Sequence, residues 1–257
     1  MTRKLSILIA SSLCLAFALS SCSKNYDGPS ESTIKSKIIG KWKSTYANGI
    51  EELTNEREIR SFYEDGTSTS SSTKFNDWLS KTYENFSVKD NIITIQRLID
   101  NNIVEQTVSD IDDDSYSISR FRYLQHPEFT SKRTEVFKKI HVDYTDSIVG
   151  LWEGVDIEGD TTYGSIDHRW EYRADSTYTY YVMENGEWIP SENPFNEYNV
   201  DGDWLVSRWI QEEGGEMNYE WWDIERCDRY EMIWNGLRER KDGTRFTTKF
   251  IMRRVRD

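Results

Sequence analysis

The sequence predicts an all-β protein made of two tandem, small antiparallel up-and-down β-barrels. Three observations lead to this prediction: an internal repeat, short alternating runs of apolar and polar residues separated by turn residues, and a high aromatic content. Of the 257 residues, 14% are aromatic and ten are Trp, whereas disordered chains are poor in such residues. The mean hydropathy of −0.75 excludes a polytopic membrane protein, because no second long apolar run follows the N-terminus.

The charge of the chain is acidic and unevenly distributed. The formal net charge is −13, which argues against nucleic-acid binding, since nucleic acid attracts clustered Lys and Arg. Residues 37–141 contain fifteen basic and seventeen acidic residues, whereas residues 147–257 contain thirteen and twenty-four. The second part also holds eight of the ten Trp. This divergence predicts different roles for the two parts.

The N-terminal residues 1–21 are expected to be a signal peptide. Two basic residues precede an apolar stretch over residues 5–19, which is too short to span a bilayer comfortably. The sequence Leu-Ser-Ser then precedes Cys22 and resembles the lipobox of bacterial lipoproteins. The resemblance implies cleavage before Cys22 and lipidation of that residue, which would anchor the protein durably. A plain secretory signal with an incidental Cys is the alternative.

The residues after the signal bear on location. Ser23 is compatible with sorting to the outer membrane of a Gram-negative bacterium, with the protein facing the periplasm or the cell surface. Residues 22–36 contain a Gly, a Pro and several Ser, and we expect them to form a flexible tether. If Cys22 carries lipid, Cys227 has no partner, so no intramolecular disulfide is expected.

An internal repeat divides the rest of the chain into two similar parts. Residues 38–42 (Ile-Ile-Gly-Lys-Trp) return as 148–152 (Ile-Val-Gly-Leu-Trp), an offset of 110 positions. Near the ends, 136–140 matches 251–255 at an offset of 115. Landmarks in the same order with slowly growing offsets indicate two homologous domains, each long enough to build a core. The predicted domains are residues 37–142 and 147–257.

Each copy is expected to contain eight short strands and no convincing helix, because turn residues such as Asp-Gly and Asp-Asn interrupt the alternating runs. The strands predicted in the first copy are 40–47, 56–63, 67–74, 82–88, 92–98, 103–111, 115–123 and 133–140. Those predicted in the second copy are 150–156, 167–173, 176–183, 195–200, 203–209, 215–224, 228–235 and 245–253. Eight hairpin-linked strands close most simply as a barrel, which removes exposed edges. A two-sheet sandwich is the alternative.

The first predicted strand of each copy carries a family resemblance. The Gly-x-Trp at residues 40–42 and 150–152 resembles the start of lipocalin-like domains. The Asp-Gly-Thr hairpin at 65–67 and the Phe-x-Val run at 86–88 also resemble the short lipocalin-like domains of Bacteroidota lipoproteins. The resemblance covers nearly all of both copies and implies that each Trp packs across a barrel floor. Such a barrel is either filled by its own side chains or holds one small ligand.

Aromatic residues of the second copy are the candidate ligand-binding residues, since several are spaced to share a strand face. The candidates are Trp170, Tyr172, Tyr219, Trp221, Tyr230 and Trp234. Aromatic faces stack on sugar C–H surfaces or on cations, and carboxylates bind hydroxyl or ammonium groups. The acidic, aromatic second copy therefore favours a glycan-like or cationic ligand over a fatty acid. The alternative is that these rings form only the core.

An apolar segment at residues 185–195 lies between the third and fourth predicted strands of the second copy. It contains Trp188, and the corresponding region of the first copy contains Trp78 and Phe75. The segment is expected to be a structural plug over one barrel end, or else a lid or partner-docking loop.

Motifs of catalysis and metal binding are missing from the sequence. The three His are scattered, and the alternating acids at 110–114 lack the Gly and distal Glu of an EF-hand loop. Ser165, Asp167 and His168 are close in sequence, but no nucleophile elbow surrounds this Ser. No phosphate loop or dinucleotide fingerprint is present. We therefore expect no catalytic residue, no metal and no cofactor.

These observations predict a membrane-anchored, non-enzymatic lipoprotein whose second barrel binds a small ligand. The alternative is an envelope or surface interaction module, with filled barrels and loops that dock another protein. The expected partners are thus the membrane through the lipid anchor, and either a small ligand or an envelope protein; nucleic acid is not expected.

Overall fold

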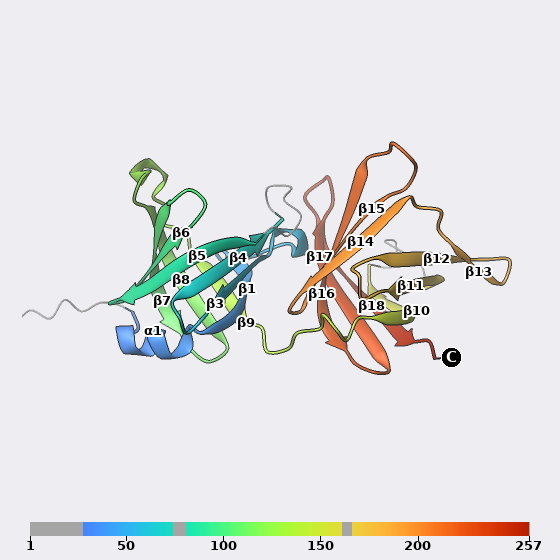
Figure 1. The fold of residues 1–257 in the computed structure, drawn as a ribbon, viewed down its shortest axis with the longest axis horizontal. Coiled ribbons are helices and arrows are strands. Elements are labelled where there is room, and N and C mark those ends of the chain that lie inside the picture. Colours follow the sequence, from blue (N-terminus) through green and yellow to red (C-terminus); the bar gives the residue numbers. More distant parts are fainter. Residues whose placement is uncertain (1–27, 74–80, 161–165, 257) are drawn as a thin grey trace, which may run out of the picture.

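The computed structural model describes residues 28–73, 81–160 and 166–256, and within them the chain forms two tandem antiparallel β-sheets (Figure 1). The strands of the first sheet are β1 (Gly40–Ala47), β2 (Ile50–Glu51), β3 (Glu58–Phe62), β4 (Thr67–Ser72), β5 (Thr82–Lys89), β6 (Ile92–Arg97), β7 (Ile103–Ile111), β8 (Ser115–Tyr123) and β9 (Glu135–Lys139). Each strand from β3 to β9 pairs with the next, and β1 pairs with both β3 and β9. Eight strands therefore close into an up-and-down barrel, with β2 added at one edge.

The second sheet follows the same plan but curls without closing. Its strands are β10 (Gly150–Gly159), β11 (His168–Tyr172), β12 (Tyr178–Glu184), β13 (Glu187–Pro190), β14 (Phe195–Asp201), β15 (Trp204–Ile210), β16 (Met217–Cys227), β17 (Glu231–Glu239) and β18 (Arg245–Arg254). The order runs from β13 through β12, β11, β10, β18, β17, β16 and β15 to β14. The predicted all-β tandem fold is confirmed, and the second barrel is a curled half-barrel.

An unpredicted strand explains the open seam of the second sheet. In the first barrel, β4 pairs with β5 over four residues. In the second, β13 forms a hairpin with β12 and occupies the edge that β14 would need. The two sides of the seam meet at the isolated bridge between Thr177 and Glu197, and the hydroxyl of Tyr198 donates across it to the carbonyl of Arg173 at 2.6 Å. The segment 185–195, expected to be a loop, therefore contains a strand that extends away from the barrel (Figure 1).

The repeat expected from the sequence recurs in atomic detail. The indole Nε1 of Trp42 donates to the carbonyl of Ile38 at 2.7 Å, and that of Trp152 donates to Ile148 at 2.7 Å. Both rings are fully buried, and each lies beneath a cation from the last strand of its own barrel. The Gly two residues before each Trp has a φ near +135°, a conformation that L side chains rarely adopt. The Gly-x-Trp motif thus performs the same packing role in both barrels.

Part of the predicted flexible tether is a helix instead. Helix α1 (Glu31–Lys37) begins at Ser30, whose side chain accepts a hydrogen bond from the backbone N–H of Thr33. Ile34 is fully buried and packs into the core of the first barrel. The N-cap and this single apolar anchor order the segment. Two 3₁₀ turns, Thr54–Glu56 and Pro127–Phe129, complete the helical elements of the described residues.

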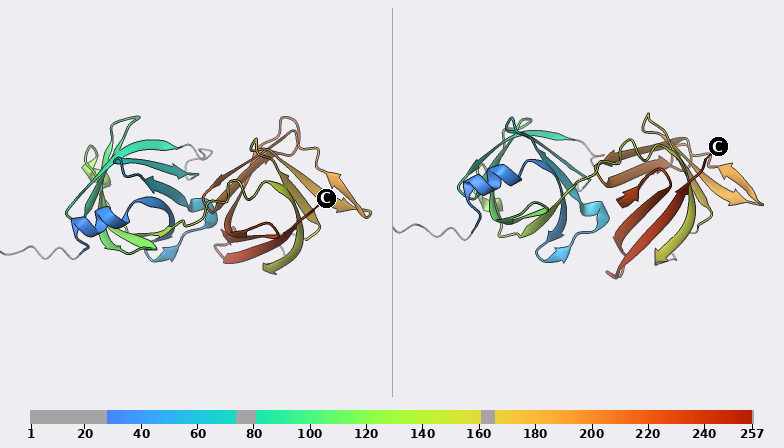
Figure 2. Two further views of the ribbon diagram at one scale, coloured as in Figure 1. Left: turned by 60° about the horizontal axis from the view of Figure 1, so that its bottom comes forward. Right: turned by 90° about the horizontal axis from the view of Figure 1, so that it is seen from below.

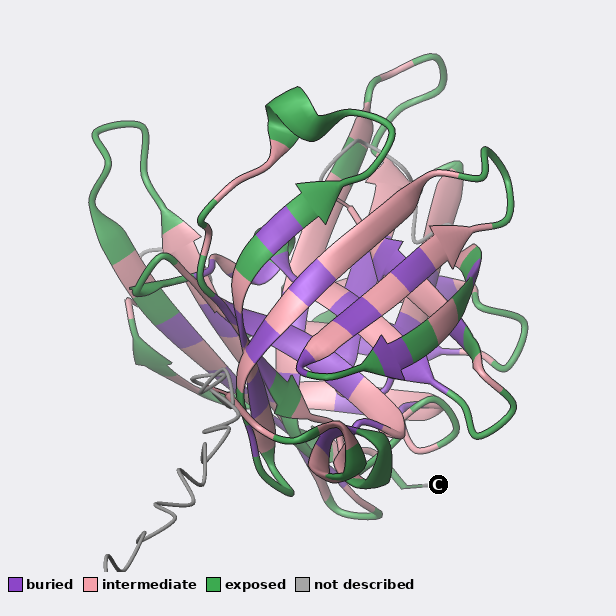
Figure 3. Cartoon of the chain, turned by 90° about the vertical axis from the view of Figure 1, so that its left-hand side faces the viewer, coloured by how far each residue is buried: buried purple, intermediate pink, exposed green. Residues whose placement is uncertain are grey.

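Burial alternates along the strands, as expected for sheets with one face inside a barrel (Figure 3). The first core joins α1 to inward residues of β1, β3 and β5–β9. The second core is built largely from aromatic residues of β10–β18. Each sheet therefore has an interior of its own.

The two barrels lie side by side and share a packed junction (Figure 2). Lys43 of β1 contacts Asp203 at 2.9 Å and Asp223 at 2.8 Å, and Arg57 contacts Asp223 at 3.2 Å. The Nε1 of Trp204 donates to the carbonyl of Thr54 at 3.0 Å. Because these buried charges and the indole have partners in the other barrel, separating the barrels would leave them uncompensated.

Candidate ligand-binding site

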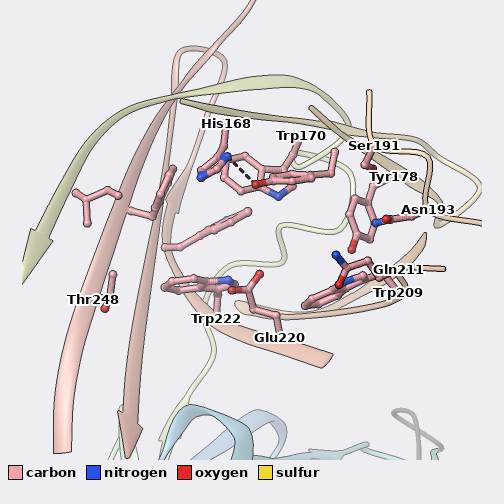
Figure 4. Close-up of a pocket in the computed structure, with 14 residues that line it drawn as sticks. His168, Trp170, Tyr178, Ser191, Asn193, Trp209, Gln211, Glu220, Trp222 and Thr248 are labelled. Atoms are coloured by element: carbon pink, nitrogen blue, oxygen red, sulfur yellow. Dashed lines mark hydrogen bonds between the residues drawn. The ribbon is translucent and has the colours of Figure 1, made fainter. Parts of the chain in front are cut away.

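A cavity of about 430 Å³ opens inside the second barrel (Figure 4). Its lining residues come from β10–β12, β15–β18 and the segment after β13: Ile157, His168, Trp170, Tyr178, Tyr180, Ser191, Asn193, Trp209, Gln211, Glu220, Trp222, Trp234, Thr248 and Phe250. The volume lies within the range of about 300–1,000 Å³ for small-molecule sites. An aromatic wall with a few convergent polar groups is also typical of such sites.

Packed rings form the apolar wall. Trp234 of β17 meets Trp170 of β11 edge to face, with ring centroids 5.1 Å apart, and stacks on Trp222 of β16 at 5.4 Å. Phe250 of β18 meets the Trp170 ring edge to face at 5.2 Å. These residues face inward because they occupy alternate positions on neighbouring strands. Each ring packs against the next, so the rings form one continuous wall on the side opposite the seam.

A glycine makes room for one of these rings. A Cβ at Gly236 would lie 3.1 Å from two ring carbons of Trp222, closer than ordinary van der Waals contact. The guanidinium of Arg238, two residues further on β17, lies 4.3 Å from the centre of the same ring. Trp222 is therefore held between the backbone of β17 and a cation.

A neutral hydrogen-bonded pair lies at the top of the cavity in Figure 4. The hydroxyl of Tyr180 and Nδ1 of His168 are 2.6 Å apart. Burial lowers the pKa of His168 below its usual 6.5, although Asp167 opposes this shift, and burial raises the pKa of Tyr180 to about 12. Both side chains are therefore uncharged at neutral pH, and together they offer one donor and one acceptor function to a ligand.

One carboxylate faces the cavity from the opposite side. Oε1 of Glu220 lies 3.5 Å from Nη2 of Arg238. Burial raises the pKa of Glu220, and both the positive charge of Arg238 and a hydrogen bond from Trp222 oppose this shift. The carboxylate is thus held in place by groups of its own barrel. Gln211 lies beside it and points in the same direction (Figure 4).

The equivalent wall of the first barrel is polar. Trp170 lies opposite Trp152 in the β10–β11 ladder, just as Arg60 lies opposite Trp42 in the β1–β3 ladder. Arg60 donates to Glu58 at 2.6 Å within the barrel. By the same offset of the repeat, Ser68 and Ser70 occupy the positions that correspond to the two tyrosines of the cavity. Both serines donate to Glu84 at 3.3 Å. A wall that carries a salt bridge and serine hydrogen bonds in one copy is thus aromatic in the other.

The structure separates the six predicted ligand-binding residues. Trp170 and Trp234 line the cavity, and Tyr172 lies buried next to it, its ring 4.7 Å from that of Tyr198. Tyr219 and Trp221 stack on each other at 5.9 Å on the outer face of β16.

Trp221 and Tyr230 lie away from the cavity. Trp221 packs against Ile59, Trp204 and Val206 at the junction of the barrels. Tyr230 is half exposed in the turn after β16, with an arginine guanidinium 4.6 Å from its ring centre. Neither residue contributes to the cavity.

Sequence reasoning did not single out Trp222, Glu220 or Trp209. In the run Tyr-Glu-Trp-Trp at 219–222, alternation assigns the rings equally well to either face. The missing signal was the register of the neighbouring strand, in which Leu205, buried in the core, lies opposite Trp222.

Two sequence predictions fall on residues that the structure does not describe. Cys22 falls in residues 1–27, and Phe75 and Trp78 fall in residues 74–80, so the lipidation site and the first-copy counterpart of the plug are not described. Trp188 lies on β13, where the guanidinium of Arg169 is 4.2 Å from its ring centre. Over the described residues, no group of three His, Cys, Asp or Glu side chains could hold a metal ion, and no helix is long and apolar enough to cross a membrane.

Comparisons with known proteins found similar solved structures, but no family model and no curated protein matches the chain. Solved structures with some similarity include two mutants of the vaccine antigen transferrin binding protein B from Haemophilus parasuis, at 7% identity and a TM-score of 0.26. They cover 78% and 77% of this chain, which spans about half of their length (54% of each). A protein of unknown function from Nostoc punctiforme, in the DUF3598 family, has the same identity and TM-score. The match covers 84% of this chain and 96% of that protein.

Proposed function

We propose that this protein is a membrane-anchored, non-enzymatic lipoprotein whose second barrel binds a small glycan-like or cationic ligand. The observation that supports ligand binding is the cavity of about 430 Å³, with its aromatic wall and few polar groups. We also propose that residues 37–142 and 147–257 are homologous domains, of which the second has acquired the binding role. The polar wall of the first barrel, at the positions that correspond to the aromatic wall of the second, supports this division of roles.

The anchor is proposed from the lipobox-like sequence before Cys22. Lipid on this residue would place the protein in the outer membrane, facing the periplasm or the cell surface. Cells given an alkyne-labelled fatty acid should label the wild-type chain but not the Cys22→Ser variant, which should leave the membrane fraction. Labelling of the variant, or its retention in the membrane, would contradict the proposal.

A non-enzymatic role is supported by the state of the titratable groups around the cavity. His168 is paired with the phenol of Tyr180, and Glu220 is held by Arg238. Within the described part of the chain, neither is hydrogen-bonded to a Ser or Cys nucleophile in the cavity. Measurable turnover of a glycan or ester by the purified protein would contradict this part of the proposal.

Ligand binding is tested by thermal shift with a matched pair of variants. Ser191 lines the cavity, whereas the next residue, Glu192, is exposed. Ser191→Trp should fill the cavity, and Glu192→Trp should add the same ring outside it. A chemically mixed library of neutral saccharides, amines and carboxylic acids is screened against the wild type.

The two variants decide where a stabilising compound binds. At a concentration of about 100 times Kd, a ligand should stabilise the native state by about 2.7 kcal/mol. We expect the effect to persist in Glu192→Trp and to disappear in Ser191→Trp. A compound that stabilises both variants equally binds elsewhere, and a library without any stabilising compound contradicts the proposal.

A second candidate function is docking of an envelope protein, and the β12–β13 hairpin favours it. β13 is the terminal strand of its sheet, and Met183 and Ile189 on this hairpin are 36% and 38% exposed. An edge strand with exposed apolar side chains can pair with a strand of another chain. Crosslinking to a defined envelope partner that is lost in Ile189→Lys, with the cavity variant Ser191→Trp unaffected, would favour this function.

A further inference from the structure

We propose that the ligand of the second barrel is a neutral saccharide, held by stacking on the indole rings and by hydrogen bonds to the polar groups opposite. This inference rests on the proposed function, because it names the class of ligand for the same cavity. Three features of the cavity support it: the ring faces, the balance of charge and the supply of hydrogen-bonding groups.

The ring faces match the apolar side of a sugar. A pyranose presents weakly positive C–H groups on its faces, and an aromatic ring carries a negative face. Trp170, Trp222 and Trp234 form one continuous wall. Trp209 also lines the cavity, and it lies near Glu220 in the lower part of the view (Figure 4). A sugar ring can therefore lie with its apolar face against this wall, while its equatorial hydroxyl groups point along the cavity.

The charge of the cavity favours a neutral ligand over a cation. Among the described residues that line the cavity, Glu220 is the one carboxylate, and the guanidinium of Arg238 lies 3.5 Å from its Oε1. A buried ammonium group would need a carboxylate without a cation of its own to offset its desolvation. Aromatic rings attract cations, but here Arg238 already occupies one face of Trp222.

The same lining disfavours a fatty acid. The described lining residues include no Lys or Arg, and the positive charge of Arg238 is matched by Glu220. A carboxylate ligand would therefore lie close to Glu220 without a free cation, and like charges repel. His168 offers no compensation at neutral pH, because burial lowers its pKa.

The hydrogen-bonding groups suit vicinal hydroxyls. A carboxyl group has several lone-pair sites, so the oxygens of Glu220 can accept from a ligand in addition to their protein donors. The side-chain Oγ of Ser191 and Nε1 of Trp234 are buried and have no hydrogen-bond partner among the described residues. Buried polar groups of this kind are normally satisfied, and the hydroxyl groups of a sugar, which both donate and accept, can satisfy both.

The test compares three ligand classes on the purified protein. The saccharide arm is an array of neutral glycans, with hits measured by isothermal titration calorimetry against the free sugar. The amine arm uses choline and tetramethylammonium, and the fatty-acid arm uses palmitate. We expect at least one neutral glycan to bind, its binding to be abolished in Ser191→Trp and retained in Glu192→Trp, and choline and palmitate to show no cavity binding.

A charge-removing variant tests the role assigned to the carboxylate. Glu220→Gln should weaken glycan binding about tenfold or more, the value expected for a hydrogen bond to a charged acceptor. The exposed Glu225 on the same strand supplies the control, since Glu225→Gln should leave the affinity unchanged.

Each outcome separates this inference from the proposed function. Binding of choline or palmitate that Ser191→Trp abolishes, without glycan binding, would overturn the saccharide assignment and leave ligand binding in place. Glycan binding that Glu220→Gln does not change would overturn the assigned hydrogen bond. The absence of cavity binding in all three arms would overturn both.

Discussion

Replacing Trp170 by alanine should destabilise the second barrel by about 3 kcal/mol. The loss of a buried Trp side chain costs about 3–5 kcal/mol in well-packed cores. Trp170 is 9% exposed and its ring meets Trp234 and Phe250 edge to face, so most of this cost applies. One side of the ring already borders the cavity and loses few contacts, which places the expected value at the lower end of the range.

The assay is urea denaturation followed by far-UV circular dichroism, with the two barrels analysed for separate transitions. With an m-value of about 1–3 kcal/mol/M, the midpoint of the second barrel should fall by about 1 M or more. Trp209→Ala is the matched control, because Trp209 lines the same cavity but is only partly buried, and its removal should cost about 1 kcal/mol. A loss below about 1 kcal/mol for Trp170→Ala, or equal losses for both variants, would refute the packing described for this wall.

Three further predictions concern the junction, the histidine and the buried thiol. Lys43→Met should lower the free energy of unfolding by about 3 kcal/mol, because it leaves two carboxylates at the junction with one other cation. The same change at the more exposed Lys41 should lower it by about 1 kcal/mol. Equal effects would contradict the burial assigned to Lys43. Burial lowers the pKa of His168 below 6.5, so its neutral form stabilises the native state above that pH, and this contribution should fade as the pH falls through and below 6.5. The free energy of unfolding of His168→Gln should lack that pH-dependent component. If the free energies of the wild type and the variant change in parallel with pH, the imidazole is not buried. Burial raises the pKa of Cys227 to about 12, so Ellman's reagent should react with this thiol at pH 8 only after unfolding, and rapid reaction of the native protein would place it at the surface.

The fold could be predicted from the sequence because local signals agreed with the repeat. The turn Asp65-Gly66 precedes β4, and the carboxylate of Asp65 accepts the backbone N–H of Thr67 at 2.9 Å. The counterpart carboxylate of Asp175 accepts the N–H of Thr177 at 3.0 Å. Turn chemistry of this kind depends on neighbouring residues alone, so it can be read from the chain and checked against its second copy.

Features that depend on distant residues could not be predicted. The open seam arises because β13 occupies an edge of β12. Asn185 and Gly186 form the two-residue turn of this hairpin, both with positive φ, and Asn-Gly is a strong hairpin signal that the sequence analysis did not use. The turn sequence reveals the hairpin, but it does not reveal that β13 excludes β14 from that edge. Helix α1 is short, and its order comes from the contact of Ile34 with the barrel core. A short helix of this kind is unstable without tertiary packing.

The candidate site was predictable in composition but not in detail. The excess of Trp and of acidic residues directed attention to the second copy, and two of the six chosen rings line the cavity of that barrel. The face of the Trp221–Trp222 doublet depends on strand register across β15 and β16. The pairing of Glu220 with Arg238 joins positions eighteen residues apart and depends on the separate pairing of β16 with β17.

The most direct test of the central claim is a crystal structure of the protein with the strongest ligand from the thermal-shift screen. The proposed function predicts ligand density inside the second barrel, against Trp170, Trp222 and Trp234, with a polar group of the ligand within hydrogen-bond distance of Glu220. Density on the β12–β13 hairpin or at the junction of the barrels, with the cavity closed by its own aromatic rings, would contradict it.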